Sequence, residues 1–134
     1  MFNGNTVIER VNHDTYRLVS TLSFTNSKYV ITVKPGVITD GASIPRFAWS
    51  LIGCPLSGKY VGSAIIHDAL YDSQILSRQE ADRIFYDMLL HNGVSKFIAK
   101  IIYYSVRLFG SKNYNGVDYY TVQKSLSLVN IDLK

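Results

Sequence analysis

The sequence predicts a single α+β domain, with strands in its first part and helices in its second. Apolar residues recur at positions 16, 18, 22 and 24, the two-residue period of a half-buried strand. Ser77 and Glu80 form a capping box, which marks the start of a helix. At 134 residues the chain has room for one hydrophobic core. We therefore expect one domain over residues 1–134.

Residues 1–36 are expected to form a small antiparallel β-meander. Its turns fall at residues 12–14 and 25–27, and such short spacers cannot cross over to a parallel strand. Pro35-Gly36 suits a type II turn, because proline fixes the first φ angle and glycine accepts a positive second one. We expect this turn to end the sheet.

Residues 37–59 are expected to form one long irregular loop. A loop of this length in a compact domain is often functional, but it can also be a connector that covers the end of a sheet. The sequence leaves both interpretations open.

Three helices are expected within residues 60–110, over about 60–72, 78–92 and 95–109, the last ending at Gly110. The first two should pack as an antiparallel hairpin. The remainder, 111–134, is predicted to be an aromatic tail with a short strand near 126–131. Its tyrosines are candidate interface residues, because aromatic side chains are enriched in interface cores: Tyr114, Tyr119 and Tyr120.

The composition excludes several classes of protein. With 47% hydrophobic and 18% charged residues, the chain is not expected to be disordered. A single cysteine, Cys54, excludes an internal disulfide framework and a cysteine-rich zinc site. The most apolar stretch, 97–109, is too short to span a bilayer, and no secretory signal is visible. A net charge of +4 is too small to indicate nucleic acid as a partner.

The predicted helix hairpin contains candidate catalytic residues. At 100° per residue, His67, Asp68 and Tyr71 share one face of the first helix, opposite an apolar face. His67 lies five residues before the expected end of that helix, and Asp82 lies five residues after Ser77. The two side chains should therefore be level across the hairpin. An aspartate bonded to one histidine nitrogen leaves the other as a general base, with Tyr71 nearby.

Asp68 is a candidate ligand for a hard cation such as Ca²⁺. Asp40 or loop carbonyls could complete its oxygen shell. A second interpretation stays open, since a histidine bonded to an aspartate between packed helices is often only a satisfied core pair. Tyr71 would then donate a structural hydrogen bond.

The sequence resembles a bacteriophage family of unknown function, DUF1353, over about residues 30–110. The resemblance rests on motifs that occur in the same order: Thr39-Asp40-Gly41-Ala42-Ser43-Ile44-Pro45-Arg46, Gly58-Lys59-Tyr60, Ile66-His67-Asp68-Ala69-Leu70-Tyr71, Ser77-Arg78-Gln79-Glu80-Ala81-Asp82-Arg83-Ile84-Phe85 and Val106-Arg107-Leu108-Phe109-Gly110. It implies a tailed-phage or prophage origin and the host cytoplasm during infection. It brings no activity.

The helix pair is also locally similar to the catalytic helices of secreted and parvoviral phospholipases. The similarity covers His67-Asp68, Tyr71 and Ala81-Asp82-Arg83. It implies that His67 is the base, Asp68 binds calcium and Asp82 orients the histidine. The paired cysteines of the secreted enzymes are absent. Their glycine-rich calcium loop has no clear match, and residues 55–59 are a poor substitute.

Three functions of different classes fit these observations. The first is a phage hydrolase that acts on lipid or another part of the cell envelope. The second is a virion component, such as a tail or neck protein, whose tyrosines dock onto a neighbouring virion protein. The third is an accessory factor that binds a host protein.

Overall fold

The computed structural model describes residues 1–13, 15–40, 44–52 and 60–134. Cys54, the motif residues 41–43 and 58–59, and the calcium-loop candidate 55–59 lie outside this part of the chain.

The described strands form two antiparallel sheets, in the orders β1-β4-β5-β7 and β2-β3-β6. The antiparallel pairing predicted for the first part of the chain is confirmed, but it is divided between two sheets rather than one meander. The strand bounds are β1 (Phe2–Asn3), β2 (Ile8–Asn12), β3 (Thr15–Leu18), β4 (Leu22–Thr25), β5 (Tyr29–Val33), β6 (Ile38–Thr39) and β7 (Val129–Leu133).

The prediction that the sheet ends at Pro35-Gly36 is wrong. Gly36 has the positive φ of the expected turn, 108°. However, the chain then forms β6, which pairs with β3, and β7 returns from the far end of the sequence to pair with β5. A strand of two residues is too short to show a period, and no local pattern reveals which partner a distant strand takes.

The three predicted helices are confirmed within one or two residues at their ends. Ser77 accepts a hydrogen bond from the Glu80 amide at 3.2 Å, as the capping box predicts. The described residues also form three short helices that were not predicted. The helix bounds are α1 (Arg46–Ile52), α2 (Val61–Ser73), α3 (Arg78–His91), α4 (Lys96–Phe109), α5 (Ser111–Asn115) and α6 (Tyr119–Leu126).

The predicted loop at 37–59 and the predicted tail at 111–134 are therefore both corrected. The first contains β6 and α1, and the second contains α5 and α6 before β7. Asp118 caps the start of α6, where its side chain accepts a hydrogen bond from the Thr121 amide at 2.7 Å. Helices of five to eight residues have too few turns to show a clear periodicity, which explains why they were missed.

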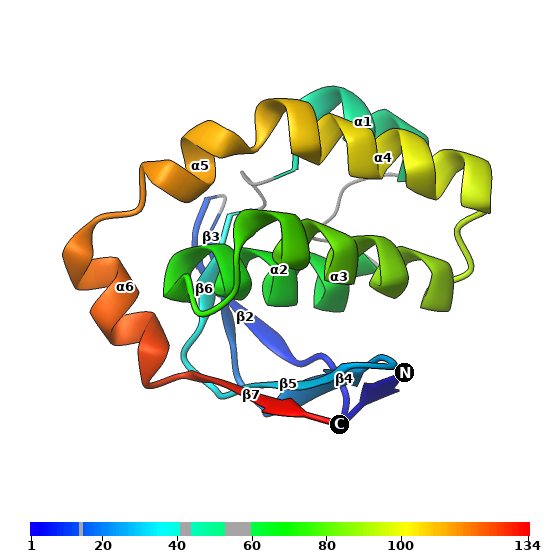
Figure 1. Cartoon of the computed structure of the whole chain (residues 1–134). Coiled ribbons are helices and arrows are strands. Elements are labelled where there is room, and N and C mark those ends of the chain that lie inside the picture. Colours follow the sequence, from blue (N-terminus) through cyan, green and yellow to red (C-terminus); the bar gives the residue numbers. More distant parts are fainter. Residues whose placement is uncertain (14, 41–43, 53–59) are drawn as a thin grey trace.

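α2 lies at the centre of the molecule. Figure 1 shows α2 and α3 between the four-stranded sheet and a layer made by α1 and α4, with α5 and α6 at one end. All residues of α2 are buried except Asp72. The expected polar face with His67, Asp68 and Tyr71 is therefore not exposed to solvent, because α2 packs against neighbours on every side. None of the described helices has the length and apolar character needed to cross a membrane.

Candidate functional site

His67 and Asp82 are brought together by the hairpin of α2 and α3. α2 ends at Ser73, and α3 starts after Ser77, so the two helices run antiparallel through a short connection. His67 Nε2 lies 2.8 Å from Asp82 Oδ1. The prediction that these two side chains lie at the same level of the hairpin and contact each other is confirmed. Both side chains have no exposed surface.

Tyr71 completes one side of this pair. Its hydroxyl donates to the same oxygen, Asp82 Oδ1, at 2.5 Å. The His67 ring lies 4.3 Å from the Tyr71 ring and stacks on Phe85 at 4.6 Å, measured between ring centroids. Burial and the neighbouring carboxylate raise the pKa of Tyr71, so its hydroxyl remains a donor. The imidazole is therefore held in one orientation.

Two guanidinium groups contact the other oxygen of Asp82. Arg107 Nη1 lies 3.0 Å and Arg78 Nη1 lies 3.5 Å from Oδ2. Burial alone would raise the pKa of Asp82, but hydrogen bonds from His67, Tyr71 and Arg107 hold it below its usual range. Asp82 is therefore ionised at neutral pH and accepts the hydrogen of His67 Nε2, which fixes the tautomer.

Arg78 also joins the start of α3 to the end of α4. Its Nη1 donates to the carbonyls of Val106 and Arg107, at 3.2 and 3.1 Å. A cation is favourable at a helix C-terminus, where carbonyl groups lack partners within the helix. The network around Asp82 therefore ties α2, α3 and α4 together, as a structural element would.

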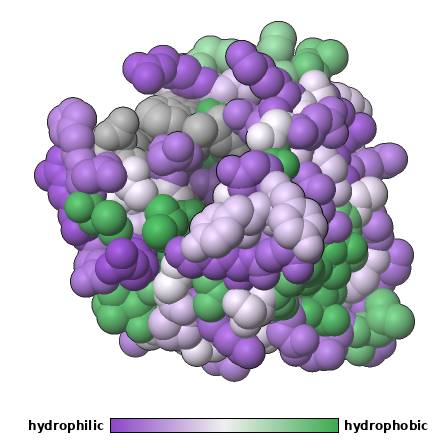
Figure 2. Space-filling model, turned by 90° about the vertical axis from the view of Figure 1, so that its left-hand side faces the viewer, coloured by the Kyte–Doolittle hydropathy of each residue, from purple (hydrophilic) through white to green (hydrophobic). Residues whose placement is uncertain are grey.

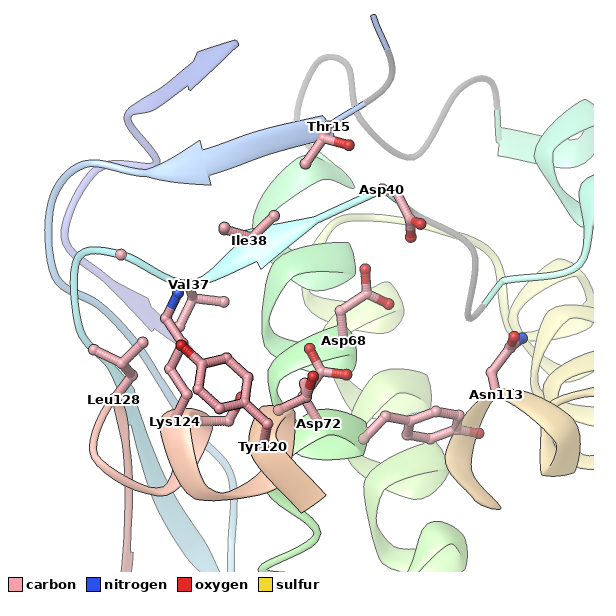
Figure 3. Close-up of a pocket in the computed structure, with 14 residues that line it drawn as sticks. Thr15, Val37, Ile38, Asp40, Asp68, Asp72, Asn113, Tyr120, Lys124 and Leu128 are labelled. Atoms are coloured by element: carbon pink, nitrogen blue, oxygen red, sulfur yellow. The ribbon is translucent and has the colours of Figure 1, made fainter. Parts of the chain in front are cut away.

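A pocket of about 400 Å³ lies beside this network (Figure 3). Its walls come from β6, α2, α5, α6 and the start of β3. Tyr71 lines it, so the pocket is separated from Asp82 and His67 by the tyrosine that contacts both. Lys124 of α6 is the only cationic side chain among the described lining residues.

Three carboxylates line the pocket: Asp40, Asp68 and Asp72. Figure 3 shows them one above the other along its wall. Asp68 is 7% exposed, and its Oδ2 accepts a hydrogen bond from the Thr39 hydroxyl, which ties α2 to β6. Burial, together with the charges of Asp68, Asp40 and Asp118, raises the pKa of Asp72 to about 7. The pocket thus concentrates negative charge.

The two predicted calcium ligands lie in this pocket, but they do not make a complete site. Within residues 1–13, 15–40, 44–52 and 60–134, no three histidine, cysteine, aspartate or glutamate side chains are grouped closely enough to hold a metal ion. Asp68 and Asp40 would therefore need further oxygen ligands, such as carbonyl groups or water.

The three predicted interface tyrosines have different environments. Tyr119 and Tyr120 are strongly exposed on α6, and Tyr120 also lines the pocket. Tyr114 instead packs against the core: its hydroxyl donates to the Leu76 carbonyl at 2.9 Å, and its ring meets the edge of Tyr71.

Sequence reasoning missed Arg78, Arg107, Thr39 and Asp72 as members of the site. Arg78 stands one helical turn before Asp82, and Asp72 one turn after Asp68, so the four-residue spacing could have indicated both. Arg107 comes from a third helix, and no local signal indicates its contact with Asp82.

Residues 16–106 match the model of a family described as a protein of unknown function, DUF1353. The chain belongs to the DUF1353 family. The segment that matches contains Asp40, His67, Asp68 and Asp82, whereas Arg107 and the α6 wall of the pocket lie beyond it.

Relatives of this DUF1353 chain occur in Sinorhizobium fredii. The uncharacterized protein y4iH is 39% identical over 74 residues, and the uncharacterized protein y4jT is 37% identical over 78 residues. These matches cover 55% and 58% of this chain, but 31% and 23% of the two relatives, so each relative is much longer than the shared segment. No solved structure matches the chain.

Proposed function

We propose that this protein is a hydrolase of phage or prophage origin that cleaves an ester bond in a lipid of the cell envelope. The observation that carries the proposal is the His67–Asp82 pair, with Nε2 and Oδ1 2.8 Å apart, next to a pocket lined by Asp68 and Tyr71. The same four residues carry the local similarity to phospholipases.

His67 is the proposed general base. Because Asp82 holds Nε2, Nδ1 is the nitrogen that takes the proton from water as the water oxygen attacks the ester carbonyl. The proton then passes to the departing alkoxide. The products are a carboxylic acid and an alcohol, and His67 returns to its neutral form.

Substrate access requires an opening beside Tyr71. His67 has no exposed surface, and among the described side chains Tyr71 both contacts its ring and lines the pocket. A histidine–aspartate pair without solvent exposure is also expected of a purely structural network. The reaction therefore depends on a movement at the pocket floor, which substrate binding would have to favour.

A divalent cation would neutralise the charge of the pocket. Asp68 and Asp40 are the proposed ligands, and a cation bound there would polarise a substrate oxygen. In a thermal unfolding assay, millimolar Ca²⁺ should raise the melting temperature of the wild type and not that of Asp68→Asn or Asp40→Asn. An equal rise in all three proteins would exclude these ligands.

The proposed activity is tested by identifying products. The protein is incubated with phospholipid vesicles and, separately, with purified peptidoglycan, and both are analysed by mass spectrometry. We expect free fatty acid and lysophospholipid from the vesicles and no soluble fragments from peptidoglycan. Fragments from peptidoglycan would move the target to the cell wall, and the absence of any product would contradict the hydrolase proposal.

A virion component is the second candidate. Tyr119 is 79% and Tyr120 74% exposed on neighbouring positions of α6, which would favour a docking surface. If this candidate is correct, purified virions contain the chain in a fixed ratio to the major capsid protein. Replacing both tyrosines by serine would then remove it from the particles.

A further inference from the structure

The outer face of α4 carries an apolar stripe that the other described elements leave largely exposed, although Ile101 within it is half-buried. It consists of Phe97, Ile101, Tyr104 and Leu108, which lie within about 60° of one another at 100° per residue. Phe97 and Leu108 are each 73% exposed, and Tyr104 is 60% exposed. The stripe extends over about 16 Å, the length of eleven helical residues.

α1 widens this apolar surface on one side. Phe109, at the end of α4, meets Phe47 of α1 edge to face, with ring centroids 6.0 Å apart. Both rings remain more than half exposed, and Leu51 adds a further exposed side chain. In Figure 2, which faces the end of the molecule with α5 and α6, pale green hydrophobic residues lie among purple hydrophilic ones along the upper edge, at the height at which Figure 1 places α1 and α4. Isolated exposed apolar residues are ordinary, but a contiguous set on two helices indicates a binding surface.

Positive charge borders the other side of the stripe. Lys96 and Lys100 are exposed on α4 next to Phe97. Neither α1 nor α4 contains an aspartate or glutamate. Arg107 is turned inward to Asp82 and does not take part. The surface is thus apolar in its middle, basic along one edge, and free of acidic residues on the helices that form it.

We propose that this surface of α1 and α4 binds an anionic lipid bilayer in the plane of its headgroups. Helices that lie in a membrane interface combine large apolar side chains on one face with lysines beside them, and anionic headgroups attract those lysines. Phe97 and Leu108 would enter the acyl boundary, and Tyr104 would keep its hydroxyl among the headgroups.

Two other occupants fit this surface less well. A second copy of the chain, packed through the same face about a two-fold axis, would offer the lysines no acidic partner, since neither α1 nor α4 contains one. Nucleic acid would complement the lysines but would leave the apolar stripe uncovered. The inference goes beyond the proposed hydrolase, since it holds whether or not His67 is catalytic.

The test is cosedimentation of the full chain with vesicles of phosphatidylcholine containing about one third phosphatidylglycerol. We expect binding that weakens with added salt and is much weaker on pure phosphatidylcholine. The double variant Phe97→Ser and Leu108→Ser should bind at least about tenfold more weakly. The matched control, Tyr119→Ser and Leu133→Ser, removes two exposed apolar side chains elsewhere and should bind like the wild type.

A charge variant provides an independent check in case the apolar variant does not fold. Lys96→Glu with Lys100→Glu should lose at least about fivefold in binding to the anionic vesicles. Lys34→Glu with Lys134→Glu carries the same change in net charge and should retain binding. His67→Asn should bind like the wild type, which separates this surface from the proposed activity.

Three results would overturn the membrane proposal. The first is a wild type that does not bind anionic vesicles. The second is unchanged vesicle binding by both the apolar variant, Phe97→Ser with Leu108→Ser, and the charge variant, Lys96→Glu with Lys100→Glu. The third is a wild-type dimer in analytical ultracentrifugation that becomes a monomer with Phe97→Ser and Leu108→Ser, because the occupant would then be a second copy of the chain.

Discussion

His67 and Asp82 contact each other through Nε2 and Oδ1 at 2.8 Å, and neither side chain has any exposed surface. Asp82 also accepts from Tyr71 and faces the guanidinium groups of Arg78 and Arg107. One carboxylate therefore links α2, α3 and α4. This arrangement makes Asp82 important for stability, whatever the role of His67 in chemistry.

Asp82→Asn should lower the free energy of unfolding by about 3 kcal/mol, because it leaves buried positive charge without its partner. Urea unfolding at pH 7 measures this difference. Asp87→Asn, five residues later on the same helix, is the matched control. Asp87 forms a partly exposed ion pair with Arg83 and accepts a hydrogen bond from the Asn26 amide at 3.2 Å, which an asparagine oxygen can still accept. Its effect should stay below about 1 kcal/mol. Equal effects of the two substitutions would show that the Asp82 network does not stabilise the fold.

Asp72 should make the protein less stable as the pH rises. Its pKa is raised to about 7 by burial and by Asp68, Asp40 and Asp118, whereas an aspartate in an unfolded chain titrates near ~4. Between these pH values the folded protein holds a proton that the unfolded chain releases. Its free energy of unfolding should therefore fall by about 2 kcal/mol from pH 5 to pH 8, allowing for partial solvent screening.

Asp72→Asn removes this titration, so its stability should change much less over the same pH range. Urea unfolding at several pH values compares the two proteins. Parallel pH profiles would show that Asp72 does not titrate in this range. The pH dependence of stability that Asp82 contributes has the opposite sign. Its lowered pKa gives stability that is present above about pH 4 and is lost below it.

Gly110→Ala should disturb the Asp82 network through Tyr71, whose hydroxyl donates to Asp82. A Cβ atom at Gly110 would lie 2.6 Å from the Tyr71 hydroxyl and 2.5 Å from the Val106 carbonyl oxygen. We expect a loss of about 2–3 kcal/mol in the free energy of unfolding. In the Tyr71→Phe background the hydroxyl contact is absent, so Gly110→Ala should cost less there. A double-mutant cycle by urea unfolding measures this coupling, and strict additivity would contradict it.

Thr39→Val should destabilise the protein by about 1–2 kcal/mol, because buried Asp68 loses the hydroxyl that donates to it. Valine keeps the shape of threonine, so the substitution removes the hydroxyl without leaving a cavity. Thr32→Val, on half-buried β5, is the control and should change stability by less than about 0.5 kcal/mol. The opposite order of the two effects would mean that the Thr39–Asp68 bond does not stabilise the contact between β6 and α2.

The pairing of His67 with Asp82 could be predicted because both ends of the hairpin have local signals. The Ser77 capping box fixes where α3 begins, and helical rise then sets the level of each residue. The contact follows from spacing alone. Asp68 and Asp40 line one pocket, and their role as cation ligands stays a prediction.

The surroundings of the pair could not be predicted in this way. α2 is buried on all sides because α6, α5 and β6 pack around it, and these elements are too short to show a pattern. Arg107 reaches Asp82 across 25 residues of sequence. Which residues of α4 remain uncovered depends on how α1 packs against it, a contact that no local pattern reveals.

The central proposal, that His67 is the base of a lipid hydrolase, is tested most directly by one comparison of initial rates. Fatty acid release from phospholipid vesicles is measured for the wild type, His67→Asn and the exposed control His91→Asn, with folding of each checked by urea unfolding. We predict at least about a hundredfold lower rate for His67→Asn and an unchanged rate for His91→Asn. A folded His67→Asn protein that hydrolyses lipid at the wild-type rate would contradict the proposal.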